Sequence, residues 1–167
     1  RAENRFHDLS LSGTGGRKDI EFSNAQAVSG RLDIAKAVAT IDGESAITVR
    51  ALADRNVFLI RSGQSVKLVS SNSLDVPEAA GGVKDGVRFL HKTIPGDPDW
   101  KGMEFAVAVV EKGDLKVVAI VTSVESSDVV GAAVKAAKAA LQEDPSKLIA
   151  NHEKTWKTFW SRSGLEI

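Results

Sequence analysis

Two apolar, β-branched segments separated by a glycine turn constrain the fold of this 167-residue chain more than any other feature. They cover residues 104–110 (EFAVAVV) and 115–121 (LKVVAIV), and Lys112-Gly113-Asp114 lies between them. Val and Ile favour strands, and a short connection that contains Gly favours an antiparallel hairpin. Because both segments are nearly free of charge, we expect central strands that are buried on both faces of a sheet.

Shorter segments with the composition of strands precede this hairpin. Strands are expected at 19–22, 31–41, 46–50, 56–61, 65–70 and 86–91. No helical periodicity interrupts the series, and short strands that follow one another in this way favour an antiparallel, all-β architecture. Residues 71–102 hold three of the four prolines and are expected to be the least regular part of the chain.

The hydrophobic period changes after residue 125 from that of strands to that of helices. Ala, the best helix former, recurs at helical spacing in residues 127–141, and Ser or Asp at 126–128 can cap that helix. Asp144 followed by Pro145 is a strong start signal for a second helix. We therefore predict a mainly β fold, an antiparallel β-sandwich followed by two C-terminal helices.

The sandwich is expected to cover residues 1–125, with an irregular or edge segment at 1–30, and the two helices to occupy 126–167. The 22 basic and 22 acidic residues cancel, which provides no electrostatic footprint for nucleic acid or an anionic membrane. No apolar run is long enough to span a bilayer, so no membrane insertion is expected. The chain has no cysteine, which excludes thiolate zinc sites, and its three histidines show no metal-ligand spacing.

Three aromatic residues share one face of the second expected helix. Trp156, Phe159 and Trp160 stand at positions i, i+3 and i+4. Such a stripe is larger than a surface helix needs for its own burial. We expect at least two of the three to be buried, against the sandwich or a second copy of the chain. The rest of the stripe, with residues 165–167, is expected to lead into a part of the protein that is absent from this chain.

Six residues at the end of the chain follow the pattern H-x-x-x-W-x-x-F-W-x-R-S. They are His152, Trp156, Phe159, Trp160, Arg162 and Ser163. This segment resembles the linker helix of a bacterial group of glycoside hydrolases with an (α/α)6 catalytic barrel, a group related to the family 95 fucosidases and the family 65 maltose phosphorylases. Weaker similarity at Gly30–Ala37 and Val57–Arg61 extends the resemblance to residues 28–167.

The resemblance implies a non-catalytic N-terminal domain, of the galactose-mutarotase-like or super-sandwich type, that supports a carbohydrate-cleaving barrel. The implied partner is the C-terminal catalytic domain of the same polypeptide, and the six motif residues would serve as the interdomain linker. It also implies a secreted or periplasmic protein, with no catalytic residue, metal or cofactor in this chain. Carbohydrate is a candidate ligand, and a dimer is a candidate state of the chain in isolation.

The loop at 91–102 offers the best candidates for sugar contact. Aromatic faces suit the C–H groups of sugars, and loops on rigid sheets commonly carry function, which points to Trp100 with His91, Asp97 and Asp99. The alternative for Trp100 is an apolar cap on the sandwich core. Glycoside hydrolysis needs two carboxyl groups at a defined separation, and Asp97 and Asp99 stand in no recognisable catalytic setting. A solvated loop is the simpler interpretation of both.

Two other classes of protein remain open on the residues alone. One is a stand-alone carbohydrate-binding or cell-surface β-sandwich module, and the other is a small intracellular β-protein with a dimerising helix. The C-terminal aromatic helix distinguishes both classes from the N-terminal domain of a glycoside hydrolase. A stand-alone lectin has no reason to end on a tryptophan-rich helix, whereas a linker into a helical barrel does.

Overall fold

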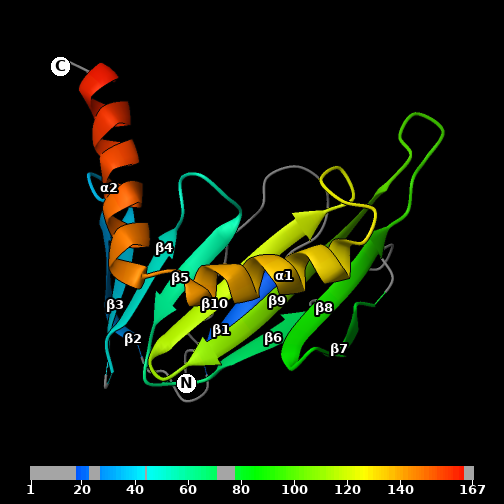
Figure 1. The fold of residues 1–167 in the computed structure, drawn as a ribbon, viewed down its shortest axis with the longest axis horizontal. Helices are drawn as coiled ribbons and strands as arrows, with labels where there is room; N and C mark the ends of the chain where they lie inside the picture. The colour runs from blue at the N-terminus through cyan, green and yellow to red at the C-terminus, as the bar shows by residue number, and fades with distance from the viewer. Residues whose placement is uncertain (1–17, 23–26, 44, 71–77, 164–167) are drawn as a thin grey trace.

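A central hairpin organises the fold, as seen in a computed structural model of the chain (Figure 1). The structure describes residues 18–22, 27–43, 45–70 and 78–163. Strands β9 (Met103–Lys112) and β10 (Leu115–Thr122) pair antiparallel, and Gly113 in their turn has a φ of +59°, a left-handed conformation that glycine adopts at no steric cost. The hairpin predicted from the sequence is confirmed.

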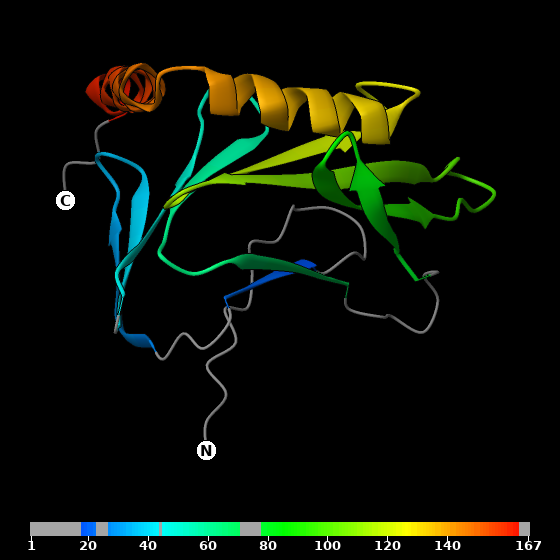
Figure 2. The ribbon, with the colours of Figure 1, turned by 60° about the horizontal axis from the view of Figure 1, so that its bottom comes forward.

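Eight strands form one antiparallel sheet in the order β2-β3-β4-β5-β10-β9-β8-β7. Besides β9 and β10, they are β2 (Ala27–Asp33), β3 (Val38–Gly43), β4 (Ile47–Ala51), β5 (Val57–Arg61), β7 (Ala80–Lys84) and β8 (Val87–Ile94). Strands β1 (Lys18–Phe22) and β6 (Val66–Ser70) pair with each other and lie beneath the large sheet (Figure 2). The predicted mainly β, sandwich-like fold with two C-terminal helices is confirmed, and the described part of the smaller layer has two strands.

The central strands bury side chains on both of their faces. On one face Val117 packs beneath the first helix, and on the other Val118 packs in the core that β6 covers. Successive residues of a strand point to opposite faces, so β9 and β10 must be apolar at nearly every position to supply both cores. This requirement accounts for the nearly uncharged segments from which the hairpin was predicted.

Helix α1 (Val129–Gln142) lies across the sheet and covers β8, β9 and β10 (Figures 1 and 2). Its contact face is built from small residues, and Ala133, Ala137 and Ala140 are at most 1% exposed. The Asp128 carboxylate accepts a hydrogen bond from the Gly131 amide at 2.8 Å, which provides the predicted N-cap. The helix therefore belongs to the same core as the sheet.

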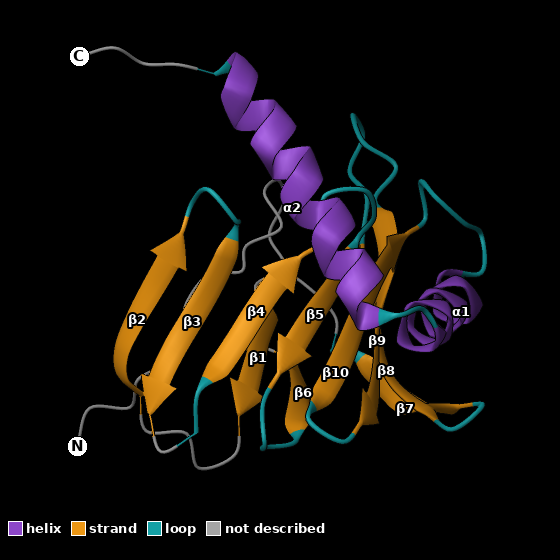
Figure 3. Cartoon of the chain, turned by 60° about the vertical axis from the view of Figure 1, so that its left-hand side comes forward, coloured by secondary structure: helices purple, strands orange, loops and turns teal. Residues whose placement is uncertain are grey.

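Helix α2 (Pro145–Arg162) follows after a short connection and runs across the ends of the neighbouring strands towards the turn between β2 and β3 (Figure 3). The predicted start is confirmed, because the Asp144 carboxylate accepts a hydrogen bond from the Ser146 amide at 2.9 Å and Pro145 occupies the first turn. Its buried residues, Leu148 and His152, both lie in its first half. In the described ranges, neither helix is long and apolar enough to cross a membrane.

The segment predicted to be least regular contains more structure than expected. Strands β7 and β8 form a hairpin there, and its turn residues Asp85 and Gly86 have φ values of 51° and 77°. Such angles are typical of the tight turns that join paired strands. Strand β7 was missed because its AGGVK sequence has a low strand propensity and every one of its residues is exposed, as on an edge strand.

Candidate functional site

His152 anchors α2 to the turn between β2 and β3. Its side chain is almost completely buried, and its Nε2 atom lies 3.0 Å from the carbonyl oxygen of Lys36 and 3.3 Å from that of Ala37. Carbonyl oxygens only accept, so this contact requires a hydrogen on Nε2, which donates to them. Ala37 has a φ of 46°, an uncommon conformation for alanine, and its amide donates to the carbonyl of Ile34 at 3.3 Å. The anchor therefore depends on the shape of this turn.

The aromatic residues of α2 continue from this anchor along one face of the helix. The ring centroids of Trp156 and Phe159 are 5.4 Å apart, those of Trp156 and Trp160 are 6.1 Å apart, and those of Phe159 and Trp160 are 4.9 Å apart. The Trp160 Nε1–H group also donates a hydrogen bond to the Ile34 carbonyl at 2.9 Å. Arg162 and Ser163, the last two motif residues, end the helix. The predicted common face of the three aromatics is confirmed.

The sandwich does not bury these rings. Trp156 is half-buried, whereas Trp160 is 39% exposed and Phe159 is 51% exposed. The expectation that at least two would be buried is wrong for the chain by itself, because the second half of α2 meets a short turn instead of the sheet. Ile34 in that turn is 59% exposed. Ile34, Trp156, Phe159 and Trp160 together form what we call the aromatic patch.

Two polar atoms, one in this patch and one next to it, are enclosed without a partner in the described part of the chain. They are Trp156 Nε1 and His152 Nδ1. The two rings meet edge-on, with their centroids 6.4 Å apart. A buried donor or acceptor without a partner costs about 1–3 kcal/mol. In the chain by itself, this region therefore carries two kinds of free-energy cost: exposed apolar rings and two enclosed polar atoms without a hydrogen bond among the described residues.

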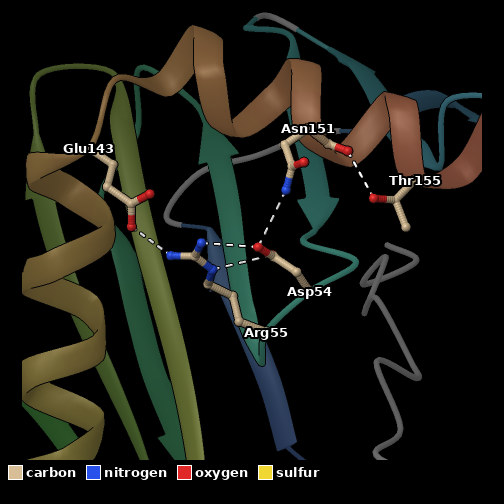
Figure 4. Close-up of polar contacts among 5 residues, drawn as sticks. All are labelled: Asp54, Arg55, Glu143, Asn151 and Thr155. Atoms are coloured by element: carbon tan, nitrogen blue, oxygen red, sulfur yellow. Dashed lines mark hydrogen bonds and ion pairs between the residues drawn. The ribbon is translucent and has the colours of Figure 1, made fainter.

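A polar network fixes the elbow between the two helices (Figure 4). The Arg55 guanidinium bonds the Asp54 carboxylate at 3.0 Å and Glu143, the C-cap of α1, at 2.6 Å. Asn151 of α2 donates to Asp54 at 3.4 Å. The hydrogen bond from Arg55 lowers the pKa of Asp54, although burial opposes part of that effect, and the same bond raises the pKa of Arg55. The loop between β4 and β5 thereby holds both helices.

A hollow of about 590 Å³ lies beside this elbow, between the same loop and α1. Its polar groups are already paired with one another. Asn56 donates to one oxygen of Glu125 at 3.1 Å, and the other oxygen of Glu125 accepts from the Thr122 amide at 2.9 Å. No aromatic side chain lines the hollow. The hollow thus offers a sugar no aromatic ring for stacking, and the polar side chains of Asn56 and Glu125 already bond each other.

Three of the candidate sugar contacts lie in one tight turn. An oxygen of the Asp97 carboxylate accepts from the Asp99 amide at 2.9 Å and from the Trp100 amide at 2.8 Å, so this carboxylate shapes the turn. The Trp100 ring is half-buried and packs against the core that includes Ile94. This position is that of an apolar cap on the core.

The fourth candidate lies apart from that turn. His91 is in β8, opposite Ala106 of β9, and its Nε2 atom is 3.3 Å from an oxygen of Glu104. The structure therefore brings Asp97, Asp99 and Trp100 together but leaves His91 on the sheet. Within residues 18–22, 27–43, 45–70 and 78–163, no group of three or more His, Asp or Glu side chains is placed to hold a metal ion.

No protein-family model matches this chain, and no curated protein sequence matches it either. The functional assignment therefore depends on the sequence resemblance and on two features of the structure. One is the arrangement of the six motif residues along α2, and the other is the exposure of the aromatic rings among them.

Proposed function

We propose that this chain is the non-catalytic N-terminal domain of a bacterial, secreted or periplasmic glycoside hydrolase. The sandwich and α1 support a carbohydrate-cleaving (α/α)6 barrel of the same polypeptide, and α2 is the helix that leads into that barrel. The observation that carries this proposal is the aromatic patch, whose three rings lie on a helix that its own sandwich holds at one end and leaves uncovered at the other (Figure 3).

The attachment of α2 supports a role as a linker. Its first half is fixed by His152 and by the elbow network around Arg55, so its direction relative to the sheet is set. Its second half presents Phe159 and Trp160 to the surroundings. Full burial of a large apolar side chain contributes about 1.5–3 kcal/mol, so a helical partner that covered both rings would gain a substantial part of its docking energy there.

Two of the described carboxylates, those of Asp97 and Asp54, support a non-catalytic role. Asp97 is bonded to backbone amides of its own turn, and Asp54 is bonded to Arg55. Glycoside hydrolysis requires one carboxyl group that donates a proton and a second that attacks or activates water. Carboxylates that are committed to local structure in this way are poor candidates for either role.

Hydrolysis of aryl-glycosides tests the proposal. Residues 1–167 and the polypeptide of the complete reading frame are purified in parallel and assayed on the same panel of substrates. The complete polypeptide is expected to hydrolyse at least one of them, residues 1–167 none, and Asp99→Asn in the complete polypeptide is expected to leave kcat unchanged. Two results would overturn the proposal. One is hydrolysis by residues 1–167 that Asp99→Asn abolishes, and the other is a complete reading frame that encodes no helical barrel.

Sugar binding separates this function from that of a stand-alone module. If residues 1–167 bind a neutral oligosaccharide, and Trp100→Ala removes that binding, the chain acts as a carbohydrate-binding module by itself. We expect no such binding, because the Trp100 ring packs against the core.

A further inference from the structure

A row of four polar side chains crosses four neighbouring strands. Arg31 of β2 is paired with Thr40 of β3, Thr40 with Thr48 of β4, and Thr48 with Arg61 of β5. Residues that are directly opposite in an antiparallel pair project from the same face of the sheet. The four side chains therefore form one continuous line, which we call the arginine row.

The arginine row lies on the face of the sheet that carries the helices. Arg61 is two residues from Leu59, which packs in the core beneath α1, so the two share a face. Ile41 and Ile47, which alternate with members of the row, pack in the opposite core. Helix α1 covers β8 to β10, and α2 crosses the ends of the neighbouring strands on the same face, so the rest of this face over β2 to β4 borders both helices (Figures 1 and 3).

Arg50 adds a second guanidinium beside this row. It is two residues from Thr48 on β4, so it shares that face, and it is half-buried. In the described part of the chain, Arg50 has no hydrogen bond or ion pair, and its Nε atom is enclosed without a partner. The Thr48 hydroxyl is enclosed in the same way. Unpaired, partly buried groups of this kind cost free energy unless an acceptor is supplied.

The acidic residues around the row are already bonded to other groups. Asp114 is paired with Arg61 at 2.8 Å, Asp42 accepts from the Ser29 hydroxyl at 3.0 Å, and Asp33 accepts from the Lys36 amide at 3.1 Å. Arg31, like Arg50, has no partner among the described residues. Neighbouring strands are about 4.8 Å apart, so the Cα atoms of Arg31 and Thr48 are about 10 Å apart across β3. Arg50 is two residues further along β4, so its Cα atom is about 12 Å from that of Arg31, a span that two long arginine side chains can bridge around one ligand group.

We propose that Arg31, Arg50 and Thr48 bind an oxyanion, the sulfate or carboxylate group of an acidic sugar. A guanidinium is planar and donates two parallel hydrogen bonds to such a group, which makes arginine the preferred ligand for oxyanions. The hydroxyls of Thr40 on β3 and Thr48 on β4 supply further donors once the side chains that enclose the Thr48 hydroxyl move aside. The preference for an oxyanion is inferred from the side chains themselves, whereas the inference that a sugar carries this oxyanion rests on the proposed function.

Titrations followed by NMR on isotope-labelled residues 1–167 test this site. The probes are a sulfated disaccharide, a galacturonate trisaccharide, a neutral maltotriose and free sodium sulfate. At least one acidic sugar is expected to give saturable shifts of the Arg50 Nε–H and Thr48 amide signals, and maltotriose none. Because the attraction is electrostatic, raising the salt concentration should weaken the binding.

Three variants and one control test which residues form the site. Arg50→Met keeps the aliphatic stem and is expected to weaken the acidic sugar about tenfold or more, the equivalent of one charge-assisted hydrogen bond or two. Thr48→Val should weaken it less, and Arg50→Lys should fall between Arg50→Met and the parent. Lys135→Met on exposed α1 removes the same charge and should leave the affinity within a factor of about two, since exposed charges act weakly at long range.

Three results would overturn the acidic-sugar site. They are titrations that do not saturate, an affinity for the acidic sugar that is unchanged in a folded Arg50→Met variant, and an affinity for free sulfate that equals the affinity for the acidic sugar. Thermal melts of each variant establish that it is folded, and Arg50→Lys serves as the test if Arg50→Met is not. A reading frame without a barrel, in a chain that still binds acidic sugar, would overturn the proposed function and leave this site standing.

Discussion

The Nε2 atom of His152 lies 3.0 Å from the carbonyl oxygen of Lys36, a residue 116 positions earlier in the chain. This contact ties α2 to the turn at the end of the first hairpin of the sheet. Its acceptor is a backbone carbonyl, so the contact depends on the conformation of the turn and not on the side chain of Lys36. The direction of α2 is therefore set by the shape of that turn.

Loss of the His152 side chain should loosen α2. We expect His152→Ala to lower the free energy of unfolding by about 2–3 kcal/mol, because it removes a buried ring and a buried hydrogen bond. Thr155→Ala is the control, since the exposed Thr155 hydroxyl bonds the Asn151 carbonyl of its own helix, and a change within about 0.5 kcal/mol is expected. Urea unfolding measures both, and equal losses would contradict the anchoring role.

The close seat of α1 on the sheet should not tolerate a larger side chain. Ala133 is 0% exposed and faces the core, so Ala133→Leu should destabilise the chain by about 1–3 kcal/mol through overpacking. Lys135→Leu places the same side chain on the exposed face of the same helix and should change stability by less than about 0.5 kcal/mol. Thermal and chemical unfolding would show this difference, and a neutral Ala133→Leu would mean that α1 sits loosely.

The elbow network should contribute a stability that depends on pH. The pKa of Asp54 is lowered in the folded chain, first by the hydrogen bond from Arg55, while burial acts in the opposite direction. Its contribution is therefore present above the ordinary pKa of about 4 and is lost as the pH falls through the lower pKa of the folded state. The difference in unfolding free energy between the parent and Asp54→Asn should shrink over that range.

Arg55→Met provides the matched background for this experiment. Without the guanidinium, the largest cause of the lowered pKa is removed, so Asp54→Asn should show much less dependence on pH. Denaturant unfolding from pH 2 to pH 6 measures the four proteins. The same pH dependence in both backgrounds would assign it to another group.

Trp156 should contribute less than a core tryptophan. It is half-buried, so we expect Trp156→Ala to cost about 1–2 kcal/mol, below the 3–5 kcal/mol of a fully buried aromatic residue. Phe159→Ala, at a position 51% exposed, should cost less than Trp156→Ala. Denaturant unfolding of the two variants gives this order, and the reverse order would mean that Phe159 packs on the sandwich.

The elements that the sequence predicts well are those with local signals. The hairpin is indicated by two continuous apolar segments on either side of Gly113. The starts of the two helices are indicated by Asp128 and by Asp144-Pro145. Each of these signals acts over a few residues. The common face of the aromatic residues of α2 follows from helical spacing in the same way. These features needed no knowledge of the tertiary structure.

The features that could not be predicted depend on contacts between distant segments. The burial of Trp156 and Trp160 depends on where α2 leaves the sheet, which is decided by the turn at Ile34 to Ala37. The arginine row depends on the register of four strands, which the turns between them set. The sequence was interpreted as one strand over 31–41, so the turn between β2 and β3, and with it this register, was missed. Asp97 stood out in the sequence beside Trp100, but its bonds to backbone amides appear only in the folded turn.

Hydrogen exchange across α2 tests the central claim most directly. Amide exchange of residues 154–163 is measured by mass spectrometry in residues 1–167 and in the polypeptide of the complete reading frame, with β9 and β10 as internal references. If the aromatic patch docks on a catalytic barrel, exchange in this segment should slow by about 100-fold or more in the complete polypeptide, since each tenfold corresponds to about 1.4 kcal/mol of opening free energy. The same exchange rates in both proteins would contradict the assignment of α2 as the linker helix.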